Sequence, residues 1–215
     1  MKVIFGTTND RKVEDLVNQA KKMKMDLNVL SMNDIGWDLG EIEETGSTIE
    51  ENSLIKAKAI FDFCSKKGIS LPIITDDAGL FVDALNGEPG IYTARYADAE
   101  RKQNPELPKY QGVIKLLDKL KKVDNRNAAY RCKVTCMLPD GTYFQSAGES
   151  KGKIAEEIIG ELKKPYFYSV FVLDGQDKPF NALTPDELET SYRYTALKNI
   201  LIELQEREKQ EDFER

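Results

Sequence analysis

The chain has 215 residues, of which 40% are hydrophobic and 32% charged. This balance suits one globular domain with room for two lobes, and it excludes a disordered chain. The net charge of −6 argues against a nucleic-acid polymer as partner. The sequence contains no histidine, which excludes histidine-dependent catalytic triads and the common zinc sites. Any catalysis must therefore use carboxylates, lysines, hydroxyls and a hard metal ion.

The cysteines and the apolar runs indicate in which cellular compartment the protein resides. The three cysteines, Cys64, Cys132 and Cys136, are odd in number and fit neither a disulfide framework nor a C-x-x-C metal site. The apolar start is too short for a signal peptide. No segment approaches the ~18 consecutive apolar residues of a membrane span. We therefore expect a cytoplasmic protein without a membrane partner.

The chain begins with a pattern typical of α/β folds. Residues 2–6 predict a buried strand, residues 7–10 a polar turn, and residues 11–24 a helix with apolar side chains at helical spacing. Such a turn directs backbone N–H groups and the positive end of a helix towards a bound anion.

The polar turn is the first candidate site. Thr7, Thr8 and Asn9 have short polar side chains that can donate to phosphate oxygens, and Lys12 adds a positive charge one turn later. An ordinary helix cap followed by a surface lysine explains the same residues.

A second helix is predicted over residues 48–67, because Thr48 and Glu51 fit a capping box and apolar residues follow at helical spacing. Gly68 ends it.

An acidic run that includes Glu43 and Glu44 precedes this helix. Solvated charge near a helix N-terminus is the usual explanation, and a carboxylate for a metal ion is the functional alternative. Lys56, within the helix, is either a second phosphate contact or an exposed lysine.

Two adjacent acids are the next candidate site. Residues 71–75 predict a buried strand, Asp76 and Asp77 follow it, and residues 79–85 predict a helix or turn. Acids at the end of such a strand lie where α/β proteins place their sites. Carboxylates are ligands for Mg²⁺ and can deprotonate a water molecule. A turn in which one aspartate caps the next helix is the structural alternative.

The rest of the chain completes a mixed sheet with helices around it. The predicted bounds are 108–122 for a helix, 128–138, 142–154 and 166–173 for strands, and Thr184 to about Glu208 for a last helix that starts with a capping box. Asp140-Gly141 predicts a hairpin turn between the first two of these strands. Residues from about 205 to 215 predict a charged tail.

Three motifs carry a resemblance to a known family. T-x-N-x-x-K is matched in residues 7–12, and E-E-T-G-x-T…E-N…K in residues 43–56. The longest, D-D-S-G-L-x-V-x-A-L-x-G-x-P-G-x-Y-S-A-R-Y, is matched in residues 76–96 with few changes. On these motifs the chain resembles the inosine/xanthosine triphosphate pyrophosphatases, also called Ham1-like or non-canonical purine NTP pyrophosphatases.

The resemblance implies an elongated ITPase-like α/β fold, a mixed sheet flanked by helices, with two lobes around a central cleft and assembly as a homodimer. It implies Mg²⁺-dependent cleavage of ITP, dITP or XTP into the monophosphate and pyrophosphate. Asp77 would be the general base and a metal contact, and Glu44 a Mg²⁺ ligand, with Glu43 and Asp76 as helpers. The polyphosphate would be held by Thr7, Asn9, Lys12 and Lys56.

The chain departs from the family where the base is bound. Ala78 replaces a hydroxyl residue, and the family's G-F-G-Y-D-P is absent from residues 164–170. The family's S-H-R reads Ser191-Tyr192-Arg193. The candidate base-side contacts are Ala78, Tyr168, Tyr192 and Arg193. Aromatic stacking would tolerate many bases, and ordinary packing explains the same rings.

Two rival functions follow from these departures. One is the same chemistry on a different modified or canonical nucleotide. The other is a nucleotide-binding protein that has lost turnover.

Overall fold

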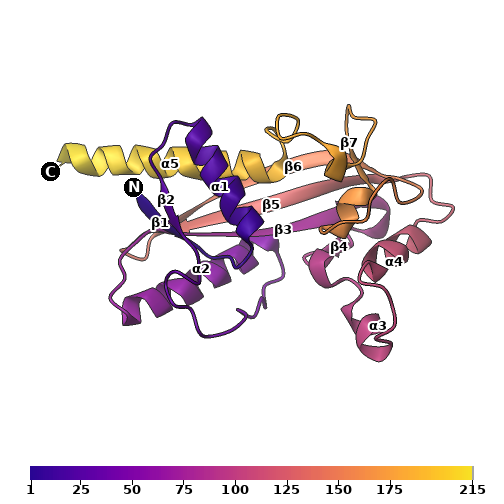
Figure 1. Ribbon diagram of the computed structural model, residues 1–215, viewed down its shortest axis with the longest axis horizontal. Coiled ribbons are helices and arrows are strands. Elements are labelled where there is room, and N and C mark those ends of the chain that lie inside the picture. The colour runs from indigo at the N-terminus through magenta and orange to yellow at the C-terminus, as the bar shows by residue number, and fades with distance from the viewer. Residues whose placement is uncertain (215) are drawn as a thin grey trace. The chain divides into compact units, whose positions relative to one another are not determined.

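The computed structural model describes residues 1–214 and has the α/β fold expected from the sequence (Figure 1). The chain divides into two compact units, called unit 1 and unit 2 below. Unit 1 contains Met1–Asp77, Cys132–Gly148 and the segment that begins at Tyr192, and unit 2 contains Ala78–Arg131 and Glu149–Ser191.

The first strands of unit 1 are parallel. β1 (Lys2–Phe5) pairs with β2 (Asn28–Leu30) on one side and with β3 (Ile73–Val82) on the other. β1 is buried from its second residue onwards, as is usual for a parallel strand that is covered on both faces. β2 was not predicted, because three residues are too few to show a periodic pattern.

Three helices belong to unit 1: α1 (Asp10–Lys22), α2 (Ile49–Lys66) and α5 (Tyr192–Glu214). α1 packs beside α5 (Figure 1). The buried side of α2 contributes to a hydrophobic core that includes Ile4, Ile60, Phe63 and Ile73. This core fixes α2 against β1 and β3, the strands that lead into the candidate site.

The start of α2 confirms the predicted cap with one change of partner. Thr48 Oγ1 accepts a hydrogen bond from the Glu51 backbone N–H at 3.1 Å. The Glu51 carboxylate accepts from the backbone N–H of Ser47 at 2.7 Å, one residue earlier than in a standard capping box.

The predicted start of the last helix is wrong. The Thr184 backbone N–H donates to Glu187 Oε2 at 2.7 Å, as a capping box requires. The segment nevertheless forms only turns, and α5 begins at Tyr192. A cap satisfies the first N–H groups, but a helix also needs a sequence that extends it. α5 then reaches Glu214, beyond the predicted end near Glu208, so most of the predicted tail is helical.

The predicted end of the strand at residue 75 is also wrong. β3 continues through Asp76 and Asp77 to Val82, and a short 3₁₀ turn, η1 (Asp83–Leu85), follows. Two charged residues look like the end of a buried strand in the sequence. Within a strand they point to opposite faces, because side chains alternate.

In unit 2 the second half of β3 pairs with a short antiparallel strand, β4 (Pro89–Gly90). The two backbones approach closely: a Cβ atom at Gly79 would lie 2.3 Å from the carbonyl oxygen of Gly90. Only glycine fits at this position of the long motif. The 3₁₀ turn η2 (Thr93–Arg95) and the helices α3 (Asp98–Gln103) and α4 (Gln111–Lys119) follow.

The predicted hairpin is confirmed. β5 (Asn127–Met137) and β6 (Tyr143–Ile154) are joined through Asp140-Gly141, where Gly141 has φ +85°. Asp140 Oδ1 accepts from the Thr142 backbone N–H at 2.9 Å and closes the turn.

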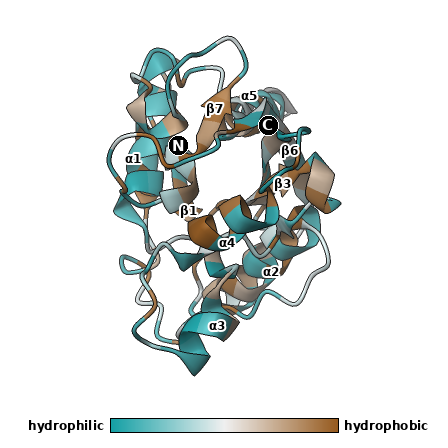
Figure 2. Cartoon of the chain, turned by 90° about the vertical axis from the view of Figure 1, so that its right-hand side faces the viewer, coloured by the Kyte–Doolittle hydropathy of each residue, from teal (hydrophilic) through white to brown (hydrophobic). Residues whose placement is uncertain are grey.

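The strand predicted over residues 166–173 is half right. Only β7 (Phe171–Leu173) is a strand, antiparallel to β6, while Tyr166–Ser169 form the 3₁₀ turn η3. A short apolar run fits a buried strand and a buried helical turn equally well. A further 3₁₀ turn, η4, covers Phe180–Ala182. β7 is hydrophobic and α3 largely hydrophilic (Figure 2).

Across the described residues, seven strands form one sheet in the order β2-β1-β3-β5-β6-β7, with β4 paired to β3. The three cysteines are free and buried. Within residues 1–214, no helix has both the length and the apolar character needed to cross a bilayer.

Candidate active site

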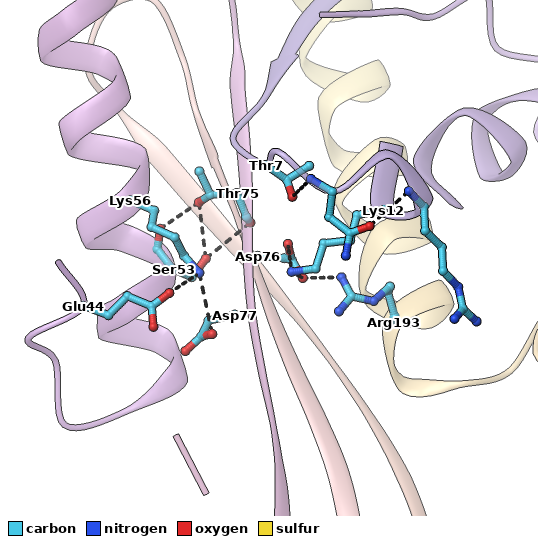
Figure 3. A network of polar contacts seen from close by, with 11 residues as sticks. Thr7, Lys12, Glu44, Ser53, Lys56, Thr75, Asp76, Asp77 and Arg193 are labelled. Atoms are coloured by element: carbon cyan, nitrogen blue, oxygen red, sulfur yellow. Dashed lines mark hydrogen bonds and ion pairs between the residues drawn. The ribbon is translucent and has the colours of Figure 1, made fainter. Parts of the chain in front are cut away.

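The candidate site lies in unit 1, where β3 passes between α2 on one side and α1 and α5 on the other (Figure 3). The alternation of β3 separates the two adjacent acids. Asp76 points towards Lys12 and Arg193, and Asp77 points towards Lys56 and Glu44 (Figure 3). The site therefore has two faces, called the Asp76 face and the Asp77 face below.

The turn between β1 and α1 forms a helix cap. Asn9 is the N-cap of α1, and its Oδ1 accepts from the Arg11 backbone N–H at 3.1 Å. Thr7 Oγ1 accepts from the Asn9 backbone N–H at 3.1 Å. Thr8 is exposed. The capping role weighed from the sequence is thus present, and phosphate binding by these residues stays a prediction.

On the Asp76 face, one buried carboxylate holds two cations. Lys12 Nζ lies 3.0 Å from Asp76 Oδ1 and 3.1 Å from Oδ2, and Arg193 Nη1 donates to Oδ2. The Asp76 side chain is only 1% exposed. It therefore ties α1 and α5 to β3, and it places two cations on one carboxylate.

The charges of this face shift each other's titration. Burial would raise the pKa of Asp76, but the charges of Arg193 and Lys12 outweigh it and hold the pKa well below its ordinary range. Burial lowers the pKa of Lys12, and the neighbouring Asp76 opposes this effect. Asp76 is thus ionised and bound to two cations, and its role as a helper at the metal stays a prediction.

On the Asp77 face, two carboxylates share one lysine. Lys56 Nζ donates to Glu44 Oε1 at 2.9 Å and lies 3.6 Å from Asp77 Oδ1. Burial alone would lower the pKa of Lys56, but the charges of Asp76, Asp77 and Glu44 together raise it. The predicted meeting of acids from distant parts of the chain is therefore present, with Lys56 between them.

A chain of buried hydroxyl groups holds α2 against the sheet behind this face. Ser53 Oγ and Thr135 Oγ1 lie 2.7 Å apart, and Thr75 Oγ1 donates to the backbone carbonyl of Ser53 at 2.7 Å. All three residues have no exposed surface. Gln145 Nε2 donates to Thr135 Oγ1 at 2.9 Å and extends the network to β6. The network fixes the register of α2, and hence the origin of the Lys56 side chain.

The acids of the Asp77 face alone supply only part of the ligands that a magnesium ion needs. Within residues 1–214, no three or more side chains of histidine, cysteine, aspartate or glutamate are grouped so as to hold a metal. Mg²⁺ is usually bound by one or two carboxylates together with waters and substrate phosphates. Glu44 and Asp77 fit that pattern. Glu43, next to Glu44 in an irregular segment, is exposed.

Comparison with known proteins agrees with the motifs and the fold. The Ham1 family matches residues 3–203 of the chain. The chain belongs to the Ham1 family. The resemblance found in the sequence is thereby confirmed, and the site described above lies within the matched residues.

Relatives in the Ham1 family cover nearly the whole chain. A dITP/XTP pyrophosphatase of Bacillus subtilis is 34% identical over 198 residues, which are 92% of this chain and 93% of that protein. Another, of Clostridium perfringens, is 36% identical over 203 residues, with 93% and 95% covered. The structure of the Staphylococcus aureus Ham1 protein has a TM-score of 0.78 at 31% identity, and the alignment covers 97% of this chain and 100% of that one.

The aromatic residues that replace the expected Ham1-family motifs are accounted for by packing. Tyr168 is 8% exposed, and its ring centroid lies 4.7 Å from that of Phe180 and 5.2 Å from that of Tyr130. Tyr192 is 2% exposed. Its carbonyl oxygen would lie 1.9 Å from a Cβ atom at Gly148, so α5 begins directly against β6. The ring contacts support packing for Tyr168, whereas for Tyr192 only the burial does, and stacking on a base stays a prediction.

The remaining base-side candidates stand close to the acids. Ala78 follows Asp77 in β3 and is half-buried. Arg193 starts α5 and is bound to Asp76, as described above. The sequence identified Arg193 as a candidate but not its partner Asp76, because the two residues lie 117 positions apart in the chain.

Sequence reasoning missed the hydroxyl network and Asp15. Ser53 was detectable as a polar residue on the apolar side of α2, one turn before Lys56. Asp15 Oδ1 accepts from the Tyr194 hydroxyl at 3.3 Å, and burial raises the pKa of Asp15 despite the nearby charge of Arg193.

Proposed function

We propose that this chain is a Mg²⁺-dependent nucleoside triphosphate pyrophosphohydrolase that converts NTP and water to NMP and pyrophosphate. Non-canonical purine nucleotides such as ITP, dITP and XTP are the proposed substrates, because the relatives described above are named dITP/XTP pyrophosphatases. One observation carries the proposal: Glu44 and Asp77 converge on one positive charge, directly beside a face that carries two further cations.

The Asp77 face is the proposed place of reaction. Glu44 and Asp77 would hold Mg²⁺, which supplies charge neutralisation for the triphosphate oxygens when bound. Asp77 orients and deprotonates the attacking water, which is a task for a carboxylate within hydrogen-bond reach. Its position in the middle of a strand, rather than in a loop, keeps its backbone fixed while it acts.

The Asp76 face and the cap of α1 are the proposed polyphosphate site. Lys12 contributes charge, and its ion pair with Asp76 holds it towards the site. Thr7, Thr8 and Asn9 surround the N-terminus of α1, where backbone N–H groups favour an anion. These groups stabilise the pyrophosphate as it leaves.

The test is a panel of nucleoside triphosphates with separate readouts for pyrophosphate and orthophosphate. ITP, dITP, XTP and the canonical nucleotides are each incubated with pure protein and Mg²⁺. Pyrophosphate from the non-canonical purines is the expected result. Orthophosphate without pyrophosphate would reject the reaction class. Tight binding of nucleotide without any product would instead identify a nucleotide-binding protein.

The same panel addresses base selectivity. Ala78 lacks a hydroxyl, and Tyr168 and Tyr192 are buried. A site with few groups that hydrogen-bond the base edge discriminates weakly. We therefore expect measurable turnover of canonical purines beside the non-canonical ones.

A homodimer that acts in the cytoplasm completes the proposal, on the strength of the family resemblance. Light scattering of the purified protein is expected to give the mass of two chains, and the mass of one chain would contradict the dimer.

A further inference from the structure

The position of Lys56 has a consequence for how the metal ion enters the site. The Lys56 ammonium group lies 2.9 Å from Glu44 and 3.6 Å from Asp77, the two residues assigned above to Mg²⁺. All three side chains are largely buried, with exposed fractions of 13%, 22% and 13% in the same order. A cation of the protein itself therefore occupies the position between the proposed metal ligands.

Two half-buried carboxylates on one face repel each other unless a cation lies between them. A lysine suits this role, because its ammonium group is a compact point charge on a long flexible stem. The base of that stem is fixed: Ser53, one turn earlier in α2, is locked to Thr75 and Thr135 by buried hydrogen bonds. The head group can thus exchange partners while the helix stays in place.

We propose that Lys56 is an internal counter-ion that occupies the divalent-cation position in the nucleotide-free protein and vacates it when a metal–nucleotide complex binds. The inference rests on the proposed function, which assigns Glu44 and Asp77 to the metal. The triphosphate supplies the new partner for the Lys56 ammonium group, so the lysine changes from the carboxylates to phosphate oxygens. Free metal alone offers Lys56 no such partner.

Weak binding of divalent metal in the absence of nucleotide follows from this exchange. A metal ion that arrives alone must displace the ammonium group from two carboxylates and leave it with only the nearby charge of Asp76. Removal of the lysine charge should therefore increase metal affinity, whereas an ordinary phosphate-binding lysine would leave the affinity of the nucleotide-free protein unchanged.

The test measures Mn²⁺ binding to the nucleotide-free protein by electron paramagnetic resonance of the free ion. Lys56→Met removes the charge and keeps an unbranched stem. Its dissociation constant for Mn²⁺ should fall about tenfold or more, within the range of typical couplings between two ligands. Lys56→Arg keeps a cation and should bind Mn²⁺ no more tightly than the unmodified chain. Lys58→Met, an exposed lysine on the same helix, is the matched control for net charge.

Three outcomes would overturn the inference. They are an unchanged Mn²⁺ affinity of Lys56→Met, an equal gain in Lys58→Met, and a gain that persists when Glu44→Gln is added to Lys56→Met. Lys56→Gln serves as a second neutral variant, and circular dichroism confirms the fold of each. Failure of the proposed function is a separate result: it would appear as the absence of pyrophosphate when the unmodified chain meets the substrate panel.

Discussion

Asp76 and Asp77 are adjacent in β3, yet their surroundings differ in the number of cations and in exposure. Asp76 is 1% exposed and bound to Lys12 and Arg193, whereas Asp77 is 13% exposed and shares Lys56 with Glu44. The alternation of the strand alone produces this difference, because it turns one carboxylate towards α1 and α5 and the other towards α2. Two identical residues in one motif thereby receive separate tasks, an anchor and a reactive group.

The strongest test of this division is Asp77→Asn. If Asp77 is the base and a metal contact, turnover should fall by about 10³-fold or more, the combined loss expected for a general base and a metal ligand. Stability should change little, because Lys56 keeps Glu44 as its partner. Pyrophosphate release and thermal unfolding are the two measurements.

Asp62→Asn is the control, since Asp62 is an exposed acid on α2. It should alter neither quantity. If Asp77→Asn turns over substrate nearly as fast as the unmodified chain, Asp77 is not the general base. The assignment of the reaction to the Asp77 face would then be wrong.

Asp76→Asn should have the opposite profile, with its main effect on stability. The change leaves Lys12 and Arg193 in a buried place without their anion, and breaking a buried ion pair costs about 3–5 kcal/mol of the free energy of unfolding. Urea denaturation at about pH 7 measures this loss against the free energy of the unmodified chain. A loss no greater than that of Asp62→Asn would show that Asp76 is not an anchor.

The pH dependence sharpens this prediction. The pKa of Asp76 is depressed from its ordinary value of 3.8, so its ion pairs contribute in full above that value. The contribution declines as the pH falls below 3.8 and is lost below the native pKa. The stability gap between the unmodified chain and Asp76→Asn should therefore narrow under acid conditions. A gap that is constant from about pH 7 to about pH 3 would contradict the charge-based explanation.

The hydroxyl network behind the Asp77 face should contribute less than either acid. Ser53→Ala leaves Thr135 without its partner at 2.7 Å and should cost about 1–3 kcal/mol of unfolding free energy. Because α2 carries Lys56, kcat should also fall by several-fold, with KM less affected. Ser65→Ala, at an exposed position of the same helix, is the matched control. A loss of stability with unchanged kcat would restrict the network to a structural role.

The sequence predicted the elements of the site better than their contacts. The bounds of α2 and the hairpin turn followed from capping and turn residues, which act over a few positions. The course of β3 through Asp76 and Asp77 did not, since charged residues within a buried strand depend on partners elsewhere. Those partners lie far away in the chain: Lys12 is 64 residues from Asp76, and Arg193 is 117. The motif located both acids, but only the fold determines which cation each one meets.

Lys56 illustrates the same limit within a single helix. Its place within the second helix was predicted, and a phosphate contact or an exposed lysine were the two interpretations. The structure places its ammonium group on the Glu44 carboxylate, because the irregular segment before α2 turns Glu44 inwards and leaves Glu43 exposed. That orientation depends on the path of an irregular segment, for which no periodic pattern exists. The phosphate contact stays a prediction.

The smallest expected effect concerns Ala78, the residue after Asp77. The long motif has serine at this position, so one added hydroxyl group restores the motif. Ala78→Ser adds a donor and acceptor at a half-buried position of β3. One hydrogen bond contributes about 0.5–1.5 kcal/mol, so the ratio of kcat/KM for XTP over GTP should change by at most about tenfold. Ala99→Ser, on the exposed side of α3, should leave the ratio unchanged. If Ala78→Ser also leaves it unchanged, Ala78 lies outside the reach of the substrate, and selectivity must come from residues other than the neighbour of the reactive acid.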